Sequence, residues 1–257
     1  MFINNLVDID VILASGSPRR KQLLEDAGIT FRVLTKNTEE NFPVYLQRAE
    51  IPLYLSKIKA QAVKAESPES LIIAADTVVI QRRDVLNKPA NKEEAKEMLQ
   101  KLSNNMHEVI TGVTICYKDQ ERSFYDITEV FFKPLSEEYI EYYIEKYSPF
   151  DKAGGYGIQE WLGMVGIRKI NGDFYNVMGL PVAKLIDELE KLFNPNLDQS
   201  QNNLAVHNDD ISNVPLIRRK NLNDLTMDNQ HMIIAEHFDS IQKVAYDIFK
   251  LTEKLKI

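Results

Sequence analysis

The chain has 257 residues, of which 44% are hydrophobic and 27% are charged, and its formal net charge at pH 7 is -7. These proportions are ordinary for globular proteins and exclude fibrous and wholly disordered classes. The length suits one large domain, or one medium domain with an appended segment. The acidic balance argues against broad electrostatic binding to nucleic acid, which needs a basic face. An anionic ligand therefore has to be held by a local cluster of cations or by a metal.

The first ten residues include Asp8 and Asp10 and lack a cationic segment, so they do not have the pattern of a secretory signal. No apolar run reaches the roughly 18–20 residues that a membrane span requires. The single cysteine, Cys116, excludes an internal disulfide and is expected to be a buried thiol. We therefore expect a cytoplasmic protein that binds neither nucleic acid nor membrane.

Short apolar runs alternate with amphipathic stretches, which is typical of an α/β domain with a mixed sheet. Capping signals, such as Asn91 followed by Glu94, mark several helix starts. Strands are expected at Val11–Ala14, Phe31–Leu34, Leu71–Ala74, Val109–Tyr117, Ser123–Phe132 and Met164–Ile170. Helices are expected at Lys21–Ala27, Leu53–Ala65, Lys92–Leu102, Glu137–Tyr147 after Ser136, and Pro181–Leu192.

Beyond Asn194 the chain becomes rich in Asn, Asp and Gln, which indicates a linker or a loosely packed tail. Apolar residues then recur at spacings of three and four from Ile234 to Leu255, which predicts one amphipathic helix. This helix either folds back onto the body or forms a homodimer contact. The predicted division is a domain over residues 1–194 and an appended segment over residues 195–257.

The segment from Ser15 to Lys21 follows an apolar run and combines small residues with three cations. A strand that ends in Ser and Gly brings backbone N–H groups close to an anion, and the following helix points its positive end at the same place. Arginine adds two-point hydrogen bonding to phosphate oxygens. The segment is either a phosphate-binding turn or a solvated basic loop that only caps a helix.

Asp76 interrupts the apolar run from Leu71 to Ile80. Burial of an unpaired carboxylate is costly, so Asp76 has to meet a cation, a metal or several donors. The acidic pair Glu39-Glu40 lies in a polar loop, and together with Asp76 it suits Mg²⁺ or Mn²⁺, which prefer carboxylate oxygens. The alternative is that Asp76 caps a turn and that the glutamates are surface charge.

Lys59, on an expected helix, and Lys88, in a loop next to a proline, suit a polyphosphate, although surface lysines are common. Seven of the ten glycines lie between Gly154 and Gly179, so the backbone is expected to bend sharply there. The same region contains Gln159, whose amide carries the donor and the acceptor that match a uracil or thymine ring. The alternative is that Gln159 bonds to the loop backbone. The four histidines form no ligand pattern, and His107 is expected to be structural.

Together these segments resemble the Maf family of nucleoside triphosphate pyrophosphatases over about residues 9–194. The resemblance implies an α/β fold with a curved mixed sheet and a cleft between two lobes, similar to inosine triphosphate pyrophosphatases. It also implies hydrolysis of a nucleoside triphosphate to the monophosphate and pyrophosphate with a divalent metal. The motifs that carry it are Leu13–Arg20, Ala75–Val78, Lys88–Pro89, Asp151–Gln159 and Asn176–Pro181.

The resemblance assigns chemical roles to individual residues. Asp76 matches the catalytic carboxylate, either as the base or as a metal ligand, and Glu40 matches an acidic residue near the metal. The positions that match phosphate contacts are Ser15, Arg20, Lys59 and Lys88.

Arg19, Thr77 and Gln159 match the three positions that mark the family branch acting on dTTP and UTP. The chain departs from the family pattern at Glu160-Trp161, where many relatives have a small residue, so the loop over the base is expected to differ. The rival hypothesis is a nucleotide-binding regulator of cell division with little turnover. Measurement of pyrophosphate release separates the two.

Overall fold

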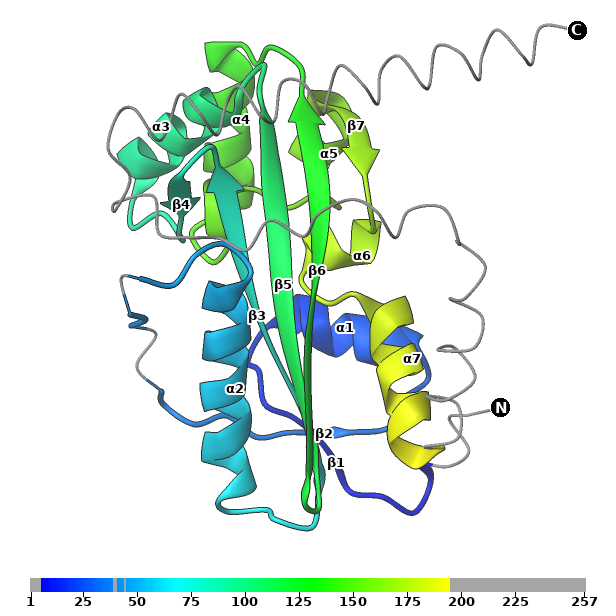
Figure 1. Cartoon of the computed structure of the whole chain (residues 1–257). Coiled ribbons are helices and arrows are strands. Elements are labelled where there is room, and N and C mark those ends of the chain that lie inside the picture. The colour runs from blue at the N-terminus through cyan, green and yellow to red at the C-terminus, as the bar shows by residue number, and fades with distance from the viewer. Residues whose placement is uncertain (1–5, 39–40, 44, 195–257) are drawn as a thin grey trace, which may run out of the picture. The chain divides into compact units, whose positions relative to one another are not determined.

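The computed structural model of the chain describes residues 6–38, 41–43 and 45–194 (Figure 1). Glu40 and the expected helix between Ile234 and Leu255 lie outside the described residues, so both stay predictions. Among the described residues, no helix combines the length and apolarity needed to cross a membrane.

A seven-stranded sheet forms the centre of the described region (Figure 1). The strand order is β2-β1-β3-β5-β6-β7, with β4 paired to β3. The β1 strand is parallel to β2 and β3, and the remaining pairs are antiparallel. This mixed sheet confirms the predicted fold class. The strands are β1 (Val11–Leu13), β2 (Arg32–Val33), β3 (Leu71–Gln81), β4 (Asp84–Leu86), β5 (Met106–Tyr117), β6 (Gln120–Phe132) and β7 (Ile167–Asn171).

Helices flank both faces of this sheet. Helix α2 lies along one face of β3 and β5, whereas α1 and α7 lie on the opposite side (Figure 1). The helices are α1 (Pro18–Asp26), α2 (Glu50–Lys64), α3 (Lys92–Leu102), α4 (Glu137–Tyr147), α5 (Trp161–Gly166), α6 (Phe174–Met178) and α7 (Val182–Phe193), with a short 3₁₀ turn η2 (Ala153–Gly155).

Strand β3 has apolar residues on both faces because helices cover both. Leu71 and Ile73 face α1 and α7, whereas Ile72 faces α2. Since side chains alternate along a strand, Asp76 points to the α2 side and Thr77 to the α1 side. Two neighbouring residues therefore reach two different sets of partners.

The edge of β3 is open near its middle. Strand β1 pairs with Leu71–Ile73 and β4 pairs with Val79–Gln81 on the same edge. In the described part of the chain, no strand pairs with the edge between these two segments, which contains Asp76 and Thr77. An opening of this kind, beside the carboxyl end of a parallel strand, is where α/β proteins place ligand sites.

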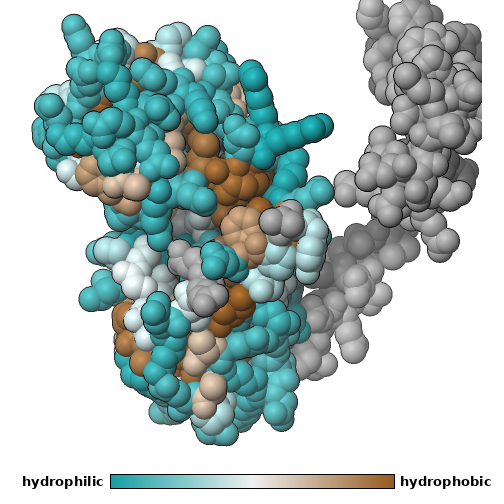
Figure 2. Space-filling view, turned by 90° about the vertical axis from the view of Figure 1, so that its left-hand side faces the viewer, coloured by the Kyte–Doolittle hydropathy of each residue, from teal (hydrophilic) through white to brown (hydrophobic). Residues whose placement is uncertain are grey.

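Two clusters of buried hydrophobic residues pack against the sheet, one on either side of this opening. One cluster joins β1, α1 and α7, and the other joins β4, α3 and α4. They form the cores of the two lobes that the sequence predicted. Figure 2 shows that the face seen from the α2 side is mainly hydrophilic, with hydrophobic residues gathered between its upper and lower parts.

Gly112 allows α2 to lie directly against the sheet. A Cβ at this position would come within 2.4 Å of the α2 backbone at Pro52 and Leu53. Gly112 pairs in register with Asp76, so the helix comes closest to the sheet beside that carboxylate. The close approach brings the next two turns of α2, which carry Lys59, over Asp76.

The sequence predicted several boundaries well. Helix α3 has the predicted bounds, and the Asn91 side chain accepts a hydrogen bond from the backbone N–H of Glu94 at 2.9 Å. Ser136 caps α4 in the same way, at 3.3 Å from the N–H of Tyr139. Pro181 is the N-cap of α7 rather than its first residue. Cys116 is a buried free thiol, as predicted.

Other boundaries were wrong. Strand β3 runs to Gln81 instead of ending at Ala74, because its ladder with β5 continues through Asp76 to Ile80. Helix α1 begins at Pro18, so Arg19 and Arg20 lie in its first turn. The expected strand from Met164 starts only at Ile167 because α5 occupies the residues before it. Strand β4 and helices α5 and α6 were not predicted.

Candidate active site

A cavity of about 640 Å³ lies at the open edge of β3, between the two hydrophobic clusters. The described residues to which the sequence assigned roles all line this one cavity, although they come from distant segments. Their roles stay predictions. They are Ser15, Arg19, Arg20, Lys59, Asp76, Thr77, Lys88 and Gln159.

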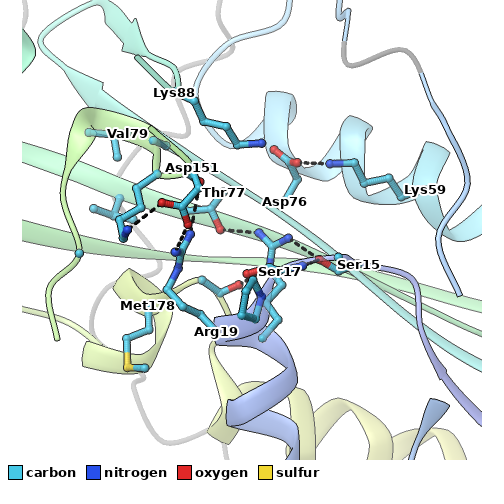
Figure 3. A pocket seen from close by; sticks show the side chains of 18 of the residues that line it. Ser15, Ser17, Arg19, Lys59, Asp76, Thr77, Val79, Lys88, Asp151 and Met178 are labelled. Carbon is cyan, nitrogen blue, oxygen red and sulfur yellow. Dashed lines mark hydrogen bonds and ion pairs between the residues drawn. The ribbon is translucent and has the colours of Figure 1, made fainter. Parts of the chain in front are cut away.

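Asp76 meets a cation, as its burial required. Its Oδ1 lies 2.5 Å from Nζ of Lys59, and the two side chains are only 13% and 17% exposed. Figure 3 shows Lys59 and Lys88 pointing toward the Asp76 carboxylate from two sides. An ion pair requires the charged carboxylate, which is the form that accepts a proton or binds a metal.

Arg20 is held in a fixed orientation on the other side of β3. Its Nε donates to the backbone oxygen of Gly179 at 2.8 Å, its Nη1 to Ser15 Oγ at 3.0 Å, and its Nη2 to Thr77 Oγ1 at 2.9 Å. Gly179 has a φ of +119°, a conformation that favours glycine. That conformation ends α6 and gives Arg20 a backbone acceptor.

Thr77 continues this contact into the sheet. Its register partner on β5 is Thr111, and the two hydroxyl oxygens lie 2.9 Å apart. Thr111 Oγ1 donates to the backbone oxygen of Asn176 at 3.0 Å, so Thr77 donates to Thr111 and accepts from Arg20. Thr111 and Asn176 are fully buried. The chain of hydrogen bonds therefore anchors Arg20 and Thr77 to the core.

Cations predominate around the cavity even though the whole chain is acidic. The turn before α1 also directs the positive end of that helix into the cavity. This local excess of positive charge suits a ligand with several phosphates. Among the described lining residues the cations are Arg19, Arg20, Lys36, Lys59, Lys88 and Lys152, and the carboxylates are Asp76 and Asp151.

Arg19 forms an ion pair that joins α1 to the glycine-rich loop. Its Nη1 donates to Asp151 Oδ2 at 2.7 Å, and Lys152 Nζ donates to the other oxygen of the same carboxylate at 2.7 Å. Partial burial raises the pKa of Asp151, but the hydrogen bonds from Lys152 and Arg19 outweigh it and hold that pKa below its usual value. The Asp151 carboxylate is therefore paired with one cation from the loop, Lys152, and with one from α1, Arg19.

Gln159 lies on the cavity wall and is exposed. Its amide forms no hydrogen bond with any described residue, so the alternative that it satisfies the loop backbone is wrong within that part of the chain. A donor and an acceptor are therefore both presented to the cavity.

The described residues contain no cluster of three or more His, Cys, Asp or Glu side chains that suits a metal. Asp76 supplies one carboxylate on the cavity wall, and Mg²⁺ is commonly held by one or two carboxylates together with substrate phosphates. The donor chemistry of Asp76 therefore fits a hard divalent cation. Glu40, the second predicted ligand, lies outside the described residues.

Sequence reasoning assigned no role to Thr111, to Asn176 or to the Asp151-Lys152 pair. Asn176, Asp151 and Lys152 lie within motifs that the sequence singled out. The available signals were the amide of Asn176 and the charges of Asp151 and Lys152. Thr111 gave no signal, since it lies in an apolar strand and its importance comes from its register with Thr77.

The fold and the cavity define an α/β protein with a cationic pocket at the edge of a mixed sheet. The chain belongs to the Maf-like protein family, which it matches over residues 10–192. This confirms the family resemblance seen in the sequence.

The chain is 80% identical over 203 residues to a protein of Cytophaga hutchinsonii named dTTP/UTP pyrophosphatase, covering 79% of this chain and 93% of the relative. It is 50% identical over 192 residues to a protein of Phocaeicola vulgatus with the same name, covering 74% of this chain and all of the relative. The solved structure titled "The structure of the Staphylococcus aureus Ham1 protein" matches with a TM-score of 0.36 and 12% identity, over 48% of this chain and 71% of that one.

Proposed function

We propose that this protein hydrolyses dTTP and UTP to the corresponding monophosphate and pyrophosphate. The observation that carries the proposal is a single cavity in which Asp76 lies among cations and an exposed Gln159 amide lies on the wall. The names of the relatives at 80% and 50% identity support the same activity.

The proposed reaction is an attack of water on the α-phosphorus, in line with the bond to the leaving pyrophosphate. A new P–O bond forms to the water oxygen, the bond between the α-phosphorus and the bridging oxygen breaks, and pyrophosphate leaves with the bond electrons. Catalysis of this reaction depends mainly on positioning and on charge stabilisation. Lys59, Lys88 and Arg20 are the cations proposed to neutralise the phosphate oxygens.

Asp76 is the residue proposed to take the proton from the attacking water. Nζ of Lys59 lies 2.5 Å from Oδ1 of this carboxylate. We further propose that Asp76, together with Glu40, holds Mg²⁺ or Mn²⁺. When bound, that cation would supply charge neutralisation at the phosphates and would lower the pKa of a bound water.

The proposed base recognition uses the Gln159 amide. Uracil and thymine present a ring N–H next to a carbonyl, and one amide matches both groups. Arg19 and Thr77, which complete the specificity positions, line the same cavity.

The test is a nucleotide panel with Mg²⁺ or Mn²⁺, in which pyrophosphate and inorganic phosphate are quantified separately. The expected result is pyrophosphate from dTTP and UTP, at higher kcat/KM than from purine triphosphates. Inorganic phosphate as the only product would indicate cleavage at the γ position and overturn the proposal. Binding of nucleotides without product would favour the regulator of cell division instead.

The remaining parts of the proposal concern the whole chain. We propose residues 1–194 as the catalytic domain, residues 195–257 as an appended segment, a cytoplasmic location and a homodimer. Sedimentation of the full chain tests the last of these, since a monomer at all concentrations would overturn it.

A further inference from the structure

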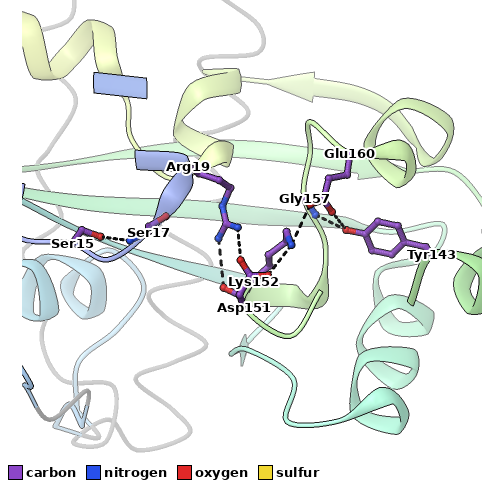
Figure 4. A network of polar contacts seen from close by, with 8 residues as sticks. All are labelled: Ser15, Ser17, Arg19, Tyr143, Asp151, Lys152, Gly157 and Glu160. Carbon is purple, nitrogen blue, oxygen red and sulfur yellow. Dashed lines mark hydrogen bonds and ion pairs between the residues drawn. The ribbon is translucent and has the colours of Figure 1, made fainter. Parts of the chain in front are cut away.

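The turn that carries Gln159 is held by a network of polar side chains. Figure 4 shows a continuous chain of polar contacts from Tyr143 on α4, through Glu160, Lys152 and Asp151, to Arg19 on α1. Glu160 directly follows Gln159 and lies at the centre of this chain.

Tyr143 fixes both ends of the turn. Its hydroxyl accepts a hydrogen bond from the backbone N–H of Gly157 at 2.9 Å and donates to Oε2 of Glu160. Burial, together with the hydrogen bond to Glu160, raises the pKa of Tyr143, so the hydroxyl keeps the proton that it donates. One buried hydroxyl therefore ties residue 157 to residue 160, with Gln159 between them.

Glu160 packs closely inside this turn. A Cβ on Gly157 would come within 2.8 Å of Cδ of Glu160, and the backbone N–H of Glu160 donates to the oxygen of Gly157 at 3.1 Å. The next residue, Trp161, packs edge-on against Tyr139 and Tyr142 of α4. The turn is thus anchored to α4 at two adjacent positions.

The second oxygen of Glu160 extends the contacts toward α1. Glu160 Oε1 lies 3.1 Å from Nζ of Lys152, which is 8% exposed and also contacts Asp151. Asp151 in turn accepts from Arg19 at 2.7 Å. A buried ammonium between two carboxylates fixes both of them, because loss of either partner leaves charge poorly compensated.

We infer that Glu160 is a positioning residue for base recognition: through Tyr143 and Lys152 it fixes the turn so that Gln159 and Arg19 act on the nucleotide base as one unit. The inference rests on the proposed function and adds a residue to its specificity. Glu160 acts through its neighbours and is not itself a catalytic residue.

The test is Glu160→Gln in the full chain, with steady-state kinetics on UTP, dTTP and GTP. The substitution keeps the side chain's size and removes the charge that holds Lys152. We expect KM for UTP and dTTP to rise about tenfold with kcat within about twofold, and GTP kinetics to stay unchanged, because only the pyrimidine-reading contacts loosen. Tyr143→Phe removes the hydroxyl on the other side and should produce the same split.

The matched control is Glu188→Gln. Glu188 on α7 has a side chain 18% exposed, against 19% for Glu160, and it also pairs with cations, Lys191 and Arg122. It lies outside the cavity lining among the described residues. This control should show a similar change in thermal stability and unchanged discrimination between UTP and GTP.

A double-mutant cycle identifies the route of the effect. In a Gln159→Ala background, Glu160→Gln should change KM for UTP by less than about twofold, because the group it positions is already absent. Full additivity, an equal loss for all three nucleotides, or unchanged KM in both single variants would overturn the inference. A wild-type protein that releases no pyrophosphate would instead overturn the proposed function, so the two failures are distinguishable.

Discussion

The two ends of the cavity differ in what their charged side chains contact. At the end formed by α1, α2 and β3, Lys59 and Lys88 point toward Asp76 at the cavity wall. At the end formed by the glycine-rich loop, Lys152 and Glu160 contact each other. The neutral Gln159 is left exposed there. The first end, called the charged end below, suits a ligand whose charge has to be neutralised. The second, called the neutral end, suits a ligand that is recognised by its shape and its hydrogen-bond pattern.

Strand β3 presents two different side chains to the cavity at adjacent positions, Asp76 and Thr77. Asp76 faces α2 and pairs with Lys59, whereas Thr77 faces α1, accepts a hydrogen bond from Arg20 and bonds to the hydroxyl of Thr111. Two adjacent residues of one strand therefore meet different partners, a lysine on one side and an arginine with a hydroxyl on the other. Substitutions at the two ends should separate kcat from specificity.

The largest effect is expected for Asp76→Asn. The amide keeps the shape of the side chain but is a poor proton acceptor and a weaker ligand for a cation than the carboxylate, so kcat for pyrophosphate release from dTTP should fall by about 10³-fold. The measurement is pyrophosphate release at saturating dTTP, with circular dichroism to show that the variant is folded. Full activity in the folded variant would remove Asp76 from the mechanism.

A smaller and selective effect is expected for Gln159→Glu. The change removes the amide donor and places an anion beside the base carbonyl, so kcat/KM for UTP and dTTP should fall by about 10²-fold. Steady-state kinetics on both substrates provide the measurement, and Gln120→Glu, at an exposed position outside the described cavity lining, is the matched control. Unchanged kinetics in Gln159→Glu would show that the base is read elsewhere.

The residues of the charged end were predictable from the sequence because their signals are local. A carboxylate in an apolar run, such as Asp76, has to be explained wherever the strand lies. The turn before α1 likewise combines glycine, serine and arginine within a few residues. The same carboxylate misled the prediction of β3, which was expected to end before it. The ladder with β5, formed by residues far along the chain, determines where β3 ends.

Thr111 and Glu160, which support the cavity-lining residues, were not predictable because they depend on pairings between residues far apart in the sequence. Thr111 matters only through its register with Thr77, 34 residues earlier. Glu160 was noticed as a departure from the family pattern, but its partner Tyr143 lies on another helix. Short polar side chains in apolar strands give no sign of which partner they meet until the register is known.

An intermediate effect is expected for Thr111→Val, which tests the support beneath Thr77. Valine matches threonine in shape but removes the hydroxyl that accepts from Thr77 and donates to the oxygen of Asn176. Arg20 and Thr77 then lose their fixed orientation, so kcat/KM for dTTP should fall about tenfold. Thr111→Ser keeps the hydroxyl and should retain most of the wild-type kcat/KM for dTTP.

Thr114→Val provides the matched control for that measurement. Thr114 is on the same strand, is equally buried, and bonds through its hydroxyl to Ser56 and Ser123 on the other face. Both valine variants should lose similar stability, of about 1–2 kcal/mol, because each leaves buried polar partners unsatisfied. Equal losses of kcat/KM in the two would mean that Thr111 supports the fold and not the site.

The smallest effect is on stability alone and concerns His107, which lies beneath the neutral end. Its ring is 1% exposed and its Nε2 lies 2.7 Å from the hydroxyl of Tyr156, a cavity-lining residue. Burial lowers the pKa of His107 to about 3, whereas an unfolded histidine titrates near 6.5. As pH falls from about 6.5 toward 3, the unfolded state takes up a proton that the folded state does not. Stability therefore decreases with falling pH, by about 2 kcal/mol between pH 7.5 and pH 5 for one such group.

Urea unfolding at these two pH values checks this, with wild type compared with His107→Gln. The other titrating groups are common to both proteins, so the wild type should lose about 2 kcal/mol more than the variant over the same interval. An identical pH dependence in the two would show that His107 becomes protonated in the folded state. In that case the neutral end would tolerate a buried charge, and its contrast with the charged end would be weaker than the geometry indicates.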